Sequence, residues 1–216
     1  MSVEDKVADL LENKKITTED AAELLQAGRD RSLPSPWQWL LAPATRMARS
    51  TRLAVTLVIV AASVAVARLL HVRFDGSLDV HLTSAAIPWA VIFLDVLAYL
   101  PLTAGVLFLV ARVCGSCAAF LDMLTAVGVA RVAMLLQALA ALAFVPAPPA
   151  DATLPPPTAG TLFGALLILP LLIWGVAMLF FHLRAATGLR GGRLAAAFIV
   201  GLIFAEVASK VLLAIV

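Results

Sequence analysis

The stretch RLAVTLVIVAASVAVARLL at residues 52–70 is the first of several long apolar runs in this chain. A helix needs about 20 consecutive apolar residues to cross the roughly 30 Å hydrocarbon core of a bilayer, and this stretch has that length. Four further apolar runs follow it, at residues 88–111, 123–145, 160–183 and 194–216. The sequence therefore predicts an all-α polytopic membrane protein, built as a five-helix transmembrane bundle with a small cytoplasmic N-terminal segment.

The composition of the whole chain supports this class. Of its 216 residues, 62% are hydrophobic and 14% are charged, whereas soluble domains carry about 25% charged residues. The sequence motifs of hydrolases, kinases, P-loops, zinc proteases and dinucleotide sites are absent. No basic patch carries the interleaved aromatic residues of a nucleic-acid site. The chain is therefore expected to be neither an enzyme nor a nucleic-acid binder, and to need no cofactor.

Lysine and arginine residues are distributed unevenly between the two sides of the predicted spans. One side has Arg68 and Arg73, and the other side has Lys6, Lys14, Lys15, Arg29, Arg31, Arg46, Arg49, Arg52, Arg112, Arg184, Arg190 and Arg193. Because short loops rich in Lys and Arg stay in the cytoplasm, we expect a cell (inner) membrane protein with a cytoplasmic N-terminus and an outside C-terminus. Residues 1–50 are charged and lack a signal-peptide core. The outer loop at residues 71–87 can hold a short hairpin around Asp75 and Gly76.

The segment before the spans begins with a predicted cytoplasmic helical hairpin at residues 1–30. Thr17 is placed to cap its second helix, with Asp20 three residues later. The apolar positions of the two helices are Val3, Val7, Leu10, Leu11, Ala21, Ala22, Leu24 and Leu25. A unit of this size cannot bury its apolar face alone. Residues 3–27 are therefore expected to pack in a homo-oligomer, on the membrane surface or on a protein partner.

Residues 31–51 form a predicted amphipathic interfacial linker, which leads into the bundle at residues 52–216. Trp37 and Trp39 suit the depth of the lipid headgroups, where indole rings prefer to lie. Arg46, Arg49 and Arg52 suit contact with lipid phosphates. Membrane lipids are therefore predicted partners. Ordinary anchoring of the first span is the preferred interpretation, and a lipid-recognising or curvature-sensing role is the alternative.

Charged residues inside the spans form a first candidate site. Asp95 lies in the second run, and Glu206 and Lys210 are four residues apart in the last run. Counting about 1.5 Å per residue from the outer ends places these three side chains at similar depths. Arg68, near the end of the first run, is a fourth candidate. We expect an outer polar cluster that either fixes helix packing or lines a cavity for a headgroup, an ion or a proton.

A second set of polar residues lies toward the inner ends of the spans: Asp122, Arg131, His182 and Arg184. Arg131 is expected to snorkel to the interface or to meet Asp122. Satisfied anchors are the preferred interpretation of this inner set. No second histidine stands at metal-ligand spacing from His182, so no metal site is predicted there.

Cys114 and Cys117 form a C-x-x-C motif in the connection after the second run. Half of a zinc site completed in a dimer is one functional interpretation, and a redox dithiol is another. The chain has no other cysteine and no thioredoxin-like pattern around the motif. We therefore expect a plain tight connection.

Two parts of the chain resemble known families. DKVADLLENKKITTEDAAELL at residues 5–25 resembles the short bacterial SHOCT-like helical modules, which implies association. CGSCAAFLDMLTAVGVARVAMLL at residues 114–136 and HLRAATGLRGGRLAAAFIV at residues 182–200 resemble the Yip1 domain family, over roughly residues 50–216. This resemblance implies a non-enzymatic protein that organises membrane or recruits partners through its hairpin. The alternative is a lipid or ion conduit that uses the polar clusters within the membrane.

Overall fold

The computed structural model describes residues 3–13, 15–18, 20–21, 35–74, 76, 80–144 and 158–215. The chain divides into two compact units, Met1–Leu40 and Leu41–Val216. The second unit contains the long apolar helices and is called the bundle below.

The first unit contains helix α1 (Val3–Glu12) and the turn that follows it. Thr17 caps this turn as predicted: its hydroxyl accepts from the backbone N–H of Asp20 at 3.1 Å, and its own N–H and hydroxyl donate to Asp20 Oδ2 at 3.1 and 2.7 Å. The hydroxyl hydrogen bond, followed by the backbone one, holds the pKa of Asp20 below its usual value. The rest of the predicted second helix lies outside the described residues, so the hairpin stays a prediction.

Two short helices occupy the predicted interfacial linker. Helix α3 (Ser35–Leu41) carries Trp37 and Trp39, and both side chains are exposed. The 3-10 helix η1 (Pro43–Arg46) belongs to the bundle, where Ala44 is buried. The second half of the linker, from Pro43 on, therefore packs against the bundle in addition to carrying residues suited to the lipid interface.

Within the described residues, five helical stretches are long and apolar enough to cross a membrane. Their elements are α4 (Arg49–Leu70); α5 (Trp89–Phe93), η2 (Leu94–Ala98) and α6 (Tyr99–Val113); α7 (Phe120–Ala130) and α8 (Val132–Phe144); α9 (Ala159–Thr187); and α10 (Gly191–Ile215). These stretches confirm the prediction of an all-α, multi-pass membrane protein, as far as helix number, length and composition are concerned. The second and third stretches are irregular, because η2 is a π-helical turn and α7 meets α8 at Arg131.

A short hairpin connects the first two spans. Strand β1 (Val72–Arg73) pairs antiparallel with β2 (His81–Leu82), with Val72 opposite Leu82 and Arg73 opposite His81. Val72 and Phe74 are fully buried at 0% exposure, so the hairpin packs onto the bundle. The hairpin expected within residues 71–87 is confirmed by this strand pairing, and it brings Arg73 to the ends of the first two spans.

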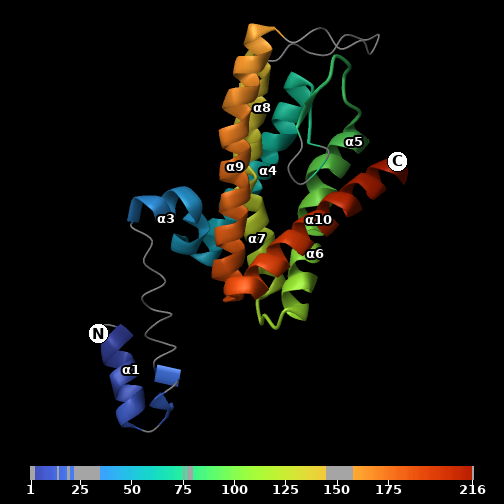
Figure 1. Ribbon diagram of the computed structural model, residues 1–216. Coiled ribbons are helices and arrows are strands. Elements are labelled where there is room, and N and C mark those ends of the chain that lie inside the picture. Colours follow the sequence, from blue (N-terminus) through green and yellow to red (C-terminus); the bar gives the residue numbers. More distant parts are fainter. Residues whose placement is uncertain are drawn as a thin grey trace. The chain divides into compact units, whose positions relative to one another are not determined.

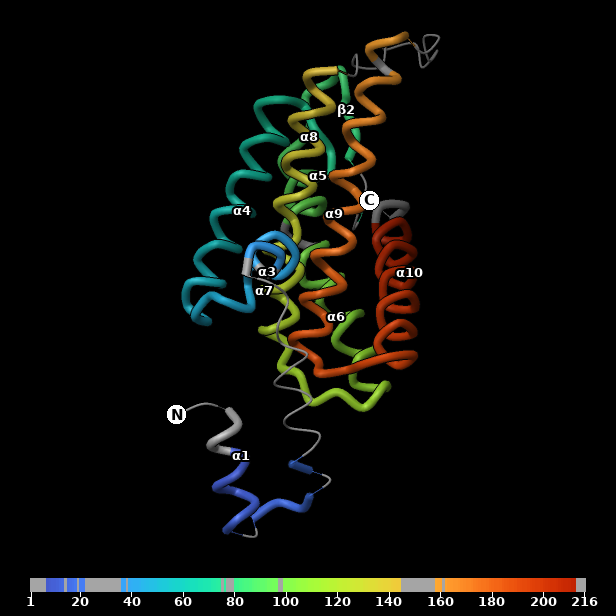
Figure 2. Tube along the Cα trace, turned by 60° about the vertical axis from the view of Figure 1, so that its left-hand side comes forward, coloured from blue at the N-terminus to red at the C-terminus, as the bar shows by residue number. Residues whose placement is uncertain are grey.

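Helix α7 lies at the centre of the bundle, where it contacts α4, α6 and α9. Helix α8 runs beside α9, and α6 packs against α10 (Figures 1 and 2). Helix α10 is oblique to the α8 and α9 pair in Figure 1. The connections from α6 to α7 and from α9 to α10 lie at one end of the bundle, and the hairpin lies toward the other.

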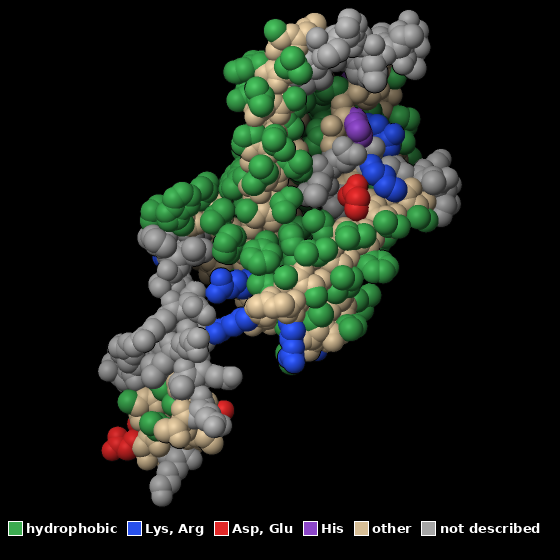
Figure 3. All heavy atoms as spheres, viewed as in Figure 1, with side chains coloured by type: hydrophobic (Ala, Val, Ile, Leu, Met, Phe, Trp, Pro, Cys, Tyr) green, Lys and Arg blue, Asp and Glu red, His purple; other side chains and the backbone are tan. Residues whose placement is uncertain are grey.

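The outward face of α9 and α10 is covered by hydrophobic side chains, as Figure 3 shows. Exposed examples on these helices are Leu162, Leu166, Leu169, Ile173, Ile199, Ile203, Phe204 and Val207. Lys and Arg side chains gather where α9 turns into α10. A lipid environment accommodates a large apolar face with a basic rim. In water, an exposed apolar patch of this size would promote aggregation.

Helices α4 and α7 approach each other closely at Gly128. A Cβ built at this position would overlap the methyl group and the hydroxyl of Thr56, which points from α4. Gly105 on α6 has no neighbouring atom within 4 Å of the same built position. Of these two glycines, only Gly128 is therefore required by packing. Small residues at helix crossings in membranes allow the same close approach of two backbones.

Candidate functional site

Asp95 is buried in the second span and forms an ion pair with Arg73 of the hairpin. Arg73 Nε donates to Asp95 Oδ2 at 3.1 Å, and Arg73 Nη2 donates to Oδ1 at 3.2 Å. The Asp95 side chain is 2% exposed and that of Arg73 is 33% exposed. This two-point geometry is the strongest form of the arginine–carboxylate pair, and it closes the hairpin over the π-helical turn η2.

Arg131 approaches Asp95 from the third span. It lies 11 residues after Phe120, where that span begins, which is about 16 Å along the helix axis. Arg131 Nη2 donates to the backbone carbonyl of Asp95 at 2.9 Å. The guanidinium group also stacks over the Phe74 ring, 5.4 Å from its centroid. A buried cation near the middle of a span is therefore held by a carbonyl of the π-helical turn and by an aromatic face.

We call Arg73, Phe74, Asp95 and Arg131 the Asp95 cluster. It differs from the predicted outer cluster, which grouped Asp95 with Glu206, Lys210 and Arg68. Arg68 stacks over the Trp89 ring at 5.6 Å instead. Arg73 was not predicted as a site residue because it lies outside the apolar runs. Its position between the apolar residues Val72 and Phe74 was the feature of the sequence that could have indicated a partly buried arginine.

Glu206 and Lys210 form the expected pair on α10. Lys210 Nζ lies 3.8 Å from Glu206 Oε1, and both side chains are partly exposed. The Glu206 carboxylate also lies against Gly76 of the hairpin, where a Cβ would be 2.6 Å from Oε1. Glu206 thus lies beside Gly76, and Tyr99 connects the same helix to the second span by donating to the Ser209 carbonyl at 2.9 Å.

Asp122 pairs with arginines of the first span. Its Oδ1 lies 3.3 Å from Arg52 Nη2 and 3.9 Å from Arg49 Nε. The expected Asp122–Arg131 contact is therefore corrected: Arg131 is too deep in the third span to reach the interface and bonds to Asp95 instead. Arg49 and Arg52, predicted as lipid anchors, fix α4 to the beginning of α7.

His182 holds the second half of the linker in place. Its Nε2 accepts from the backbone N–H of Ala44 at 3.2 Å, in a buried contact between η1 and α9. His182 is 3% exposed. Arg184, two residues further along α9, is half-buried, and Arg46 of η1 is exposed. His182 thus packs α9 against η1 in this arrangement, and the interpretation of the whole inner set as satisfied anchors stays a prediction.

The connection that carries Cys114 and Cys117 is a tight turn. Gly115 adopts φ +91°, which favours glycine. Ser116 Oγ donates to the Thr187 carbonyl at 3.2 Å and accepts from the Ala118 N–H at 3.1 Å. Cys117 is exposed and Cys114 is half-buried, and both are free. In the described part of the chain, no group of three His, Cys, Asp or Glu residues is placed to hold a metal ion.

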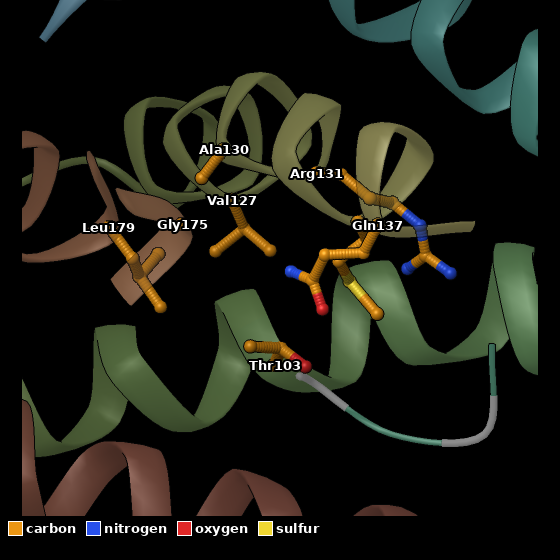
Figure 4. Close-up of a pocket in the computed structure, with 8 residues that line it drawn as sticks. Thr103, Val127, Ala130, Arg131, Gln137, Gly175 and Leu179 are labelled. Carbon is orange, nitrogen blue, oxygen red and sulfur yellow. The ribbon is translucent and has the colours of Figure 1, made fainter. Parts of the chain in front are cut away.

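A small cavity lies between the second, third and fourth spans. Its volume is about 30 Å³, and Thr103, Arg131 and Gln137 form its polar lining. Figure 4 shows Arg131 and Gln137 toward one end of this cavity and Leu179 and Gly175 toward the other. The space corresponds to one or two water molecules, so it does not accommodate a lipid headgroup.

Fold and site together define a helical multi-pass membrane protein with a charged interior. Comparison with known proteins adds no relative: no family model, no curated protein and no solved structure matches the chain.

Proposed function

We propose that this chain is a non-enzymatic membrane protein of the Yip1 type, in which the bundle anchors a small helical unit that associates with a partner or with a second copy. The observation that carries the proposal is the division into two compact units, Met1–Leu40 and Leu41–Val216. The larger unit has the properties of an anchor, and the smaller one has the properties of an association module.

The anchor role is supported by the way charges are matched inside the bundle. Asp95 pairs with Arg73, Asp122 pairs with Arg52, and Glu206 pairs with Lys210. Charges that are neutralised by one another hold helices in register. The cavity beside Arg131 is only about 30 Å³, which fits a static core better than a passage for lipids.

The association role is supported by the small size and amphipathic character of the first unit. Helix α1 buries Val7, at 5% exposure, and leaves Leu11 37% exposed. Its exposed polar side includes Asp9 and Glu12. A unit of about 40 residues rarely stabilises itself without a staple or a partner, so the remaining apolar surface favours a protein contact.

Leu11→Glu is expected to reduce this association at least about tenfold, because it places a charge on the apolar side of α1. The matched control is Asp9→Asn, which changes the exposed polar side of the same helix. The measurement is the molar mass of the detergent-purified full chain, together with quantitative cross-linking in membranes. Unchanged mass and unchanged cross-linking for both variants would contradict the proposal.

A lipid or ion conduit is the second candidate function. It is favoured by one observation: two irregular helices, at η2 and at the α7–α8 junction, meet at the buried charges Asp95 and Arg131. Interrupted helices with buried charges recur at the binding sites of transporters. The anchor proposal predicts that proteoliposomes with the wild-type chain and with Gln137→Leu show the same lipid-scrambling and ion-leak rates as protein-free vesicles. Transport by the wild type that Gln137→Leu abolishes would favour the conduit.

A further inference from the structure

Two connections meet at one end of the bundle and carry exposed arginines. Ser116 Oγ in the α6–α7 connection donates to the carbonyl of Thr187, at the end of α9, at 3.2 Å. Arg112 lies in the last turn of α6, Arg190 lies just before α10, and Arg193 lies in the first turn of α10. All three arginines are exposed, and Figure 3 shows basic side chains gathered where α9 turns into α10. We call these three arginines the arginine patch.

The packing of α6 against α10 brings two arginines of the patch to the same end of the bundle. A Cβ built at Gly201 of α10 would lie 2.7 Å from Leu107 Cδ2 of α6. Helix α6 ends and helix α10 begins at the end with the two connections (Figure 1). Arg112 follows Leu107 along α6, and Arg193 precedes Gly201 along α10, so both arginines lie on the connection side of this contact. The guanidinium of Arg112 also stacks over the Phe108 ring, 5.3 Å from its centroid.

The arginine patch lies in a part of the sequence that contains no acidic residue. Neither Asp nor Glu occurs at residues 96–121 or at residues 152–205. The next acid along the chain is Asp122, whose Oδ1 lies 3.3 Å from Arg52 Nη2 and 3.9 Å from Arg49 Nε. The linker arginines that were predicted to contact lipid phosphates therefore have a carboxylate of the bundle beside them. The arginine patch is a better candidate for that contact, because an exposed group of like charges attracts ions of the opposite sign.

The exposed side of α10 becomes apolar immediately beyond the patch. Gly192 has no neighbouring atom within 4 Å of a built Cβ, so there is open space beside the arginines. Ala196 is exposed, and Ile199 and Ile203 are 56% and 58% exposed. These four residues follow one another at intervals of three or four, so they lie along one side of the helix. A basic group above an apolar strip matches a ligand with an anionic head and a hydrocarbon chain.

We propose that the arginine patch binds the headgroup of one anionic phospholipid, with an acyl chain along this side of α10. Guanidinium groups bind phosphate oxygens by two-point hydrogen bonds that carry charge on both partners. A zwitterionic headgroup has no net charge and is held less tightly. An acidic protein segment would suit the arginines but would leave the apolar side of α10 uncovered. The site belongs to the bundle and does not depend on the role of the N-terminal unit.

Native mass spectrometry of the purified full chain tests the site. Phosphatidylglycerol or phosphatidylcholine with the same acyl chains is titrated into the detergent solution, and the affinity for the first bound lipid is measured. Phosphatidylglycerol is expected to bind at least about tenfold more tightly than phosphatidylcholine. Equal affinities for the two lipids would overturn the proposal.

Substitution of single arginines locates the bound lipid. Arg112→Gln and Arg193→Gln are each expected to weaken phosphatidylglycerol binding about fivefold. Both side chains are exposed, so the unfolding midpoint is expected to stay that of the wild type. Arg49→Gln is the matched control, because it removes the same charge from an exposed side chain that lies beside Asp122, and it should leave the affinity unchanged. Equal losses for all three variants would show a diffuse attraction to the whole basic end and overturn the assignment.

Discussion

Asp95→Asn is expected to lower the free energy of unfolding of the bundle by about 3–5 kcal/mol, because it removes the charge of a buried carboxylate that is paired with Arg73 and lies beside the buried Arg131. Arg73 loses its two-point partner, and Arg131 loses the nearby negative charge that offsets its burial. The measurement is reversible unfolding of the purified protein in mixed micelles. Asp122→Asn is the matched control. Its pairs with Arg49 and Arg52 are partly exposed, so it should cost about 1 kcal/mol or less.

A double-mutant cycle separates charge pairing from lost packing in this prediction. In the Asp95→Asn background, Arg73→Met should cost less than it does alone, because the arginine has already lost its partner. The expected interaction energy is of the order of 1–3 kcal/mol. Additive effects of the two substitutions would show that the Arg73–Asp95 pair does not stabilise the bundle.

Gly128→Ala is expected to destabilise the bundle by about 1–3 kcal/mol, although alanine is the better helix former. The added methyl group would occupy the space of the Thr56 side chain, so α4 and α7 would have to separate. Gly105→Ala, with no atom within 4 Å of the new methyl group, should be neutral or stabilising by up to about 1 kcal/mol. Both variants are measured by the same unfolding assay.

Rescue by a second substitution tests the cause assigned to the Gly128 effect. Thr56→Ala removes the methyl group and hydroxyl that the new Cβ would meet. The double variant Thr56→Ala and Gly128→Ala should therefore be more stable than Gly128→Ala alone. Lack of rescue, or equal losses for Gly105→Ala and Gly128→Ala, would contradict the close approach of the two helices.

The spans could be predicted from sequence because their signal is local. The predicted run at residues 88–111 corresponds to Trp89–Val113, and the run at residues 123–145 corresponds to Phe120–Phe144. A continuous apolar stretch of membrane-spanning length has few other stable conformations. The junction at Arg131 gave no comparable signal, whereas the irregular second span contains Pro101, which cannot donate to the carbonyl of residue 97 in η2.

The partner of Asp95 could not be predicted by the same reasoning. Counting depth along straight helices placed Glu206 and Lys210 level with Asp95, but depth does not determine which side chains face each other. Helix α10 is also oblique in the bundle (Figure 1). The actual partner, Arg73, is brought in by a hairpin whose strands are two residues each, too short for periodicity to reveal. The orientation of the termini and the Yip1 resemblance remain predictions.

If the bundle is an anchor for an association module, the first unit makes protein contacts in the membrane-bound protein. Photo-cross-linking from position 11 of α1 in intact membranes tests this claim most directly, with a cross-linker at position 9 as the control. We expect a protein adduct, to a second copy or to a partner, that is strong from position 11 and weak from position 9. Lipid adducts alone, or equal protein adducts from both positions, would contradict it.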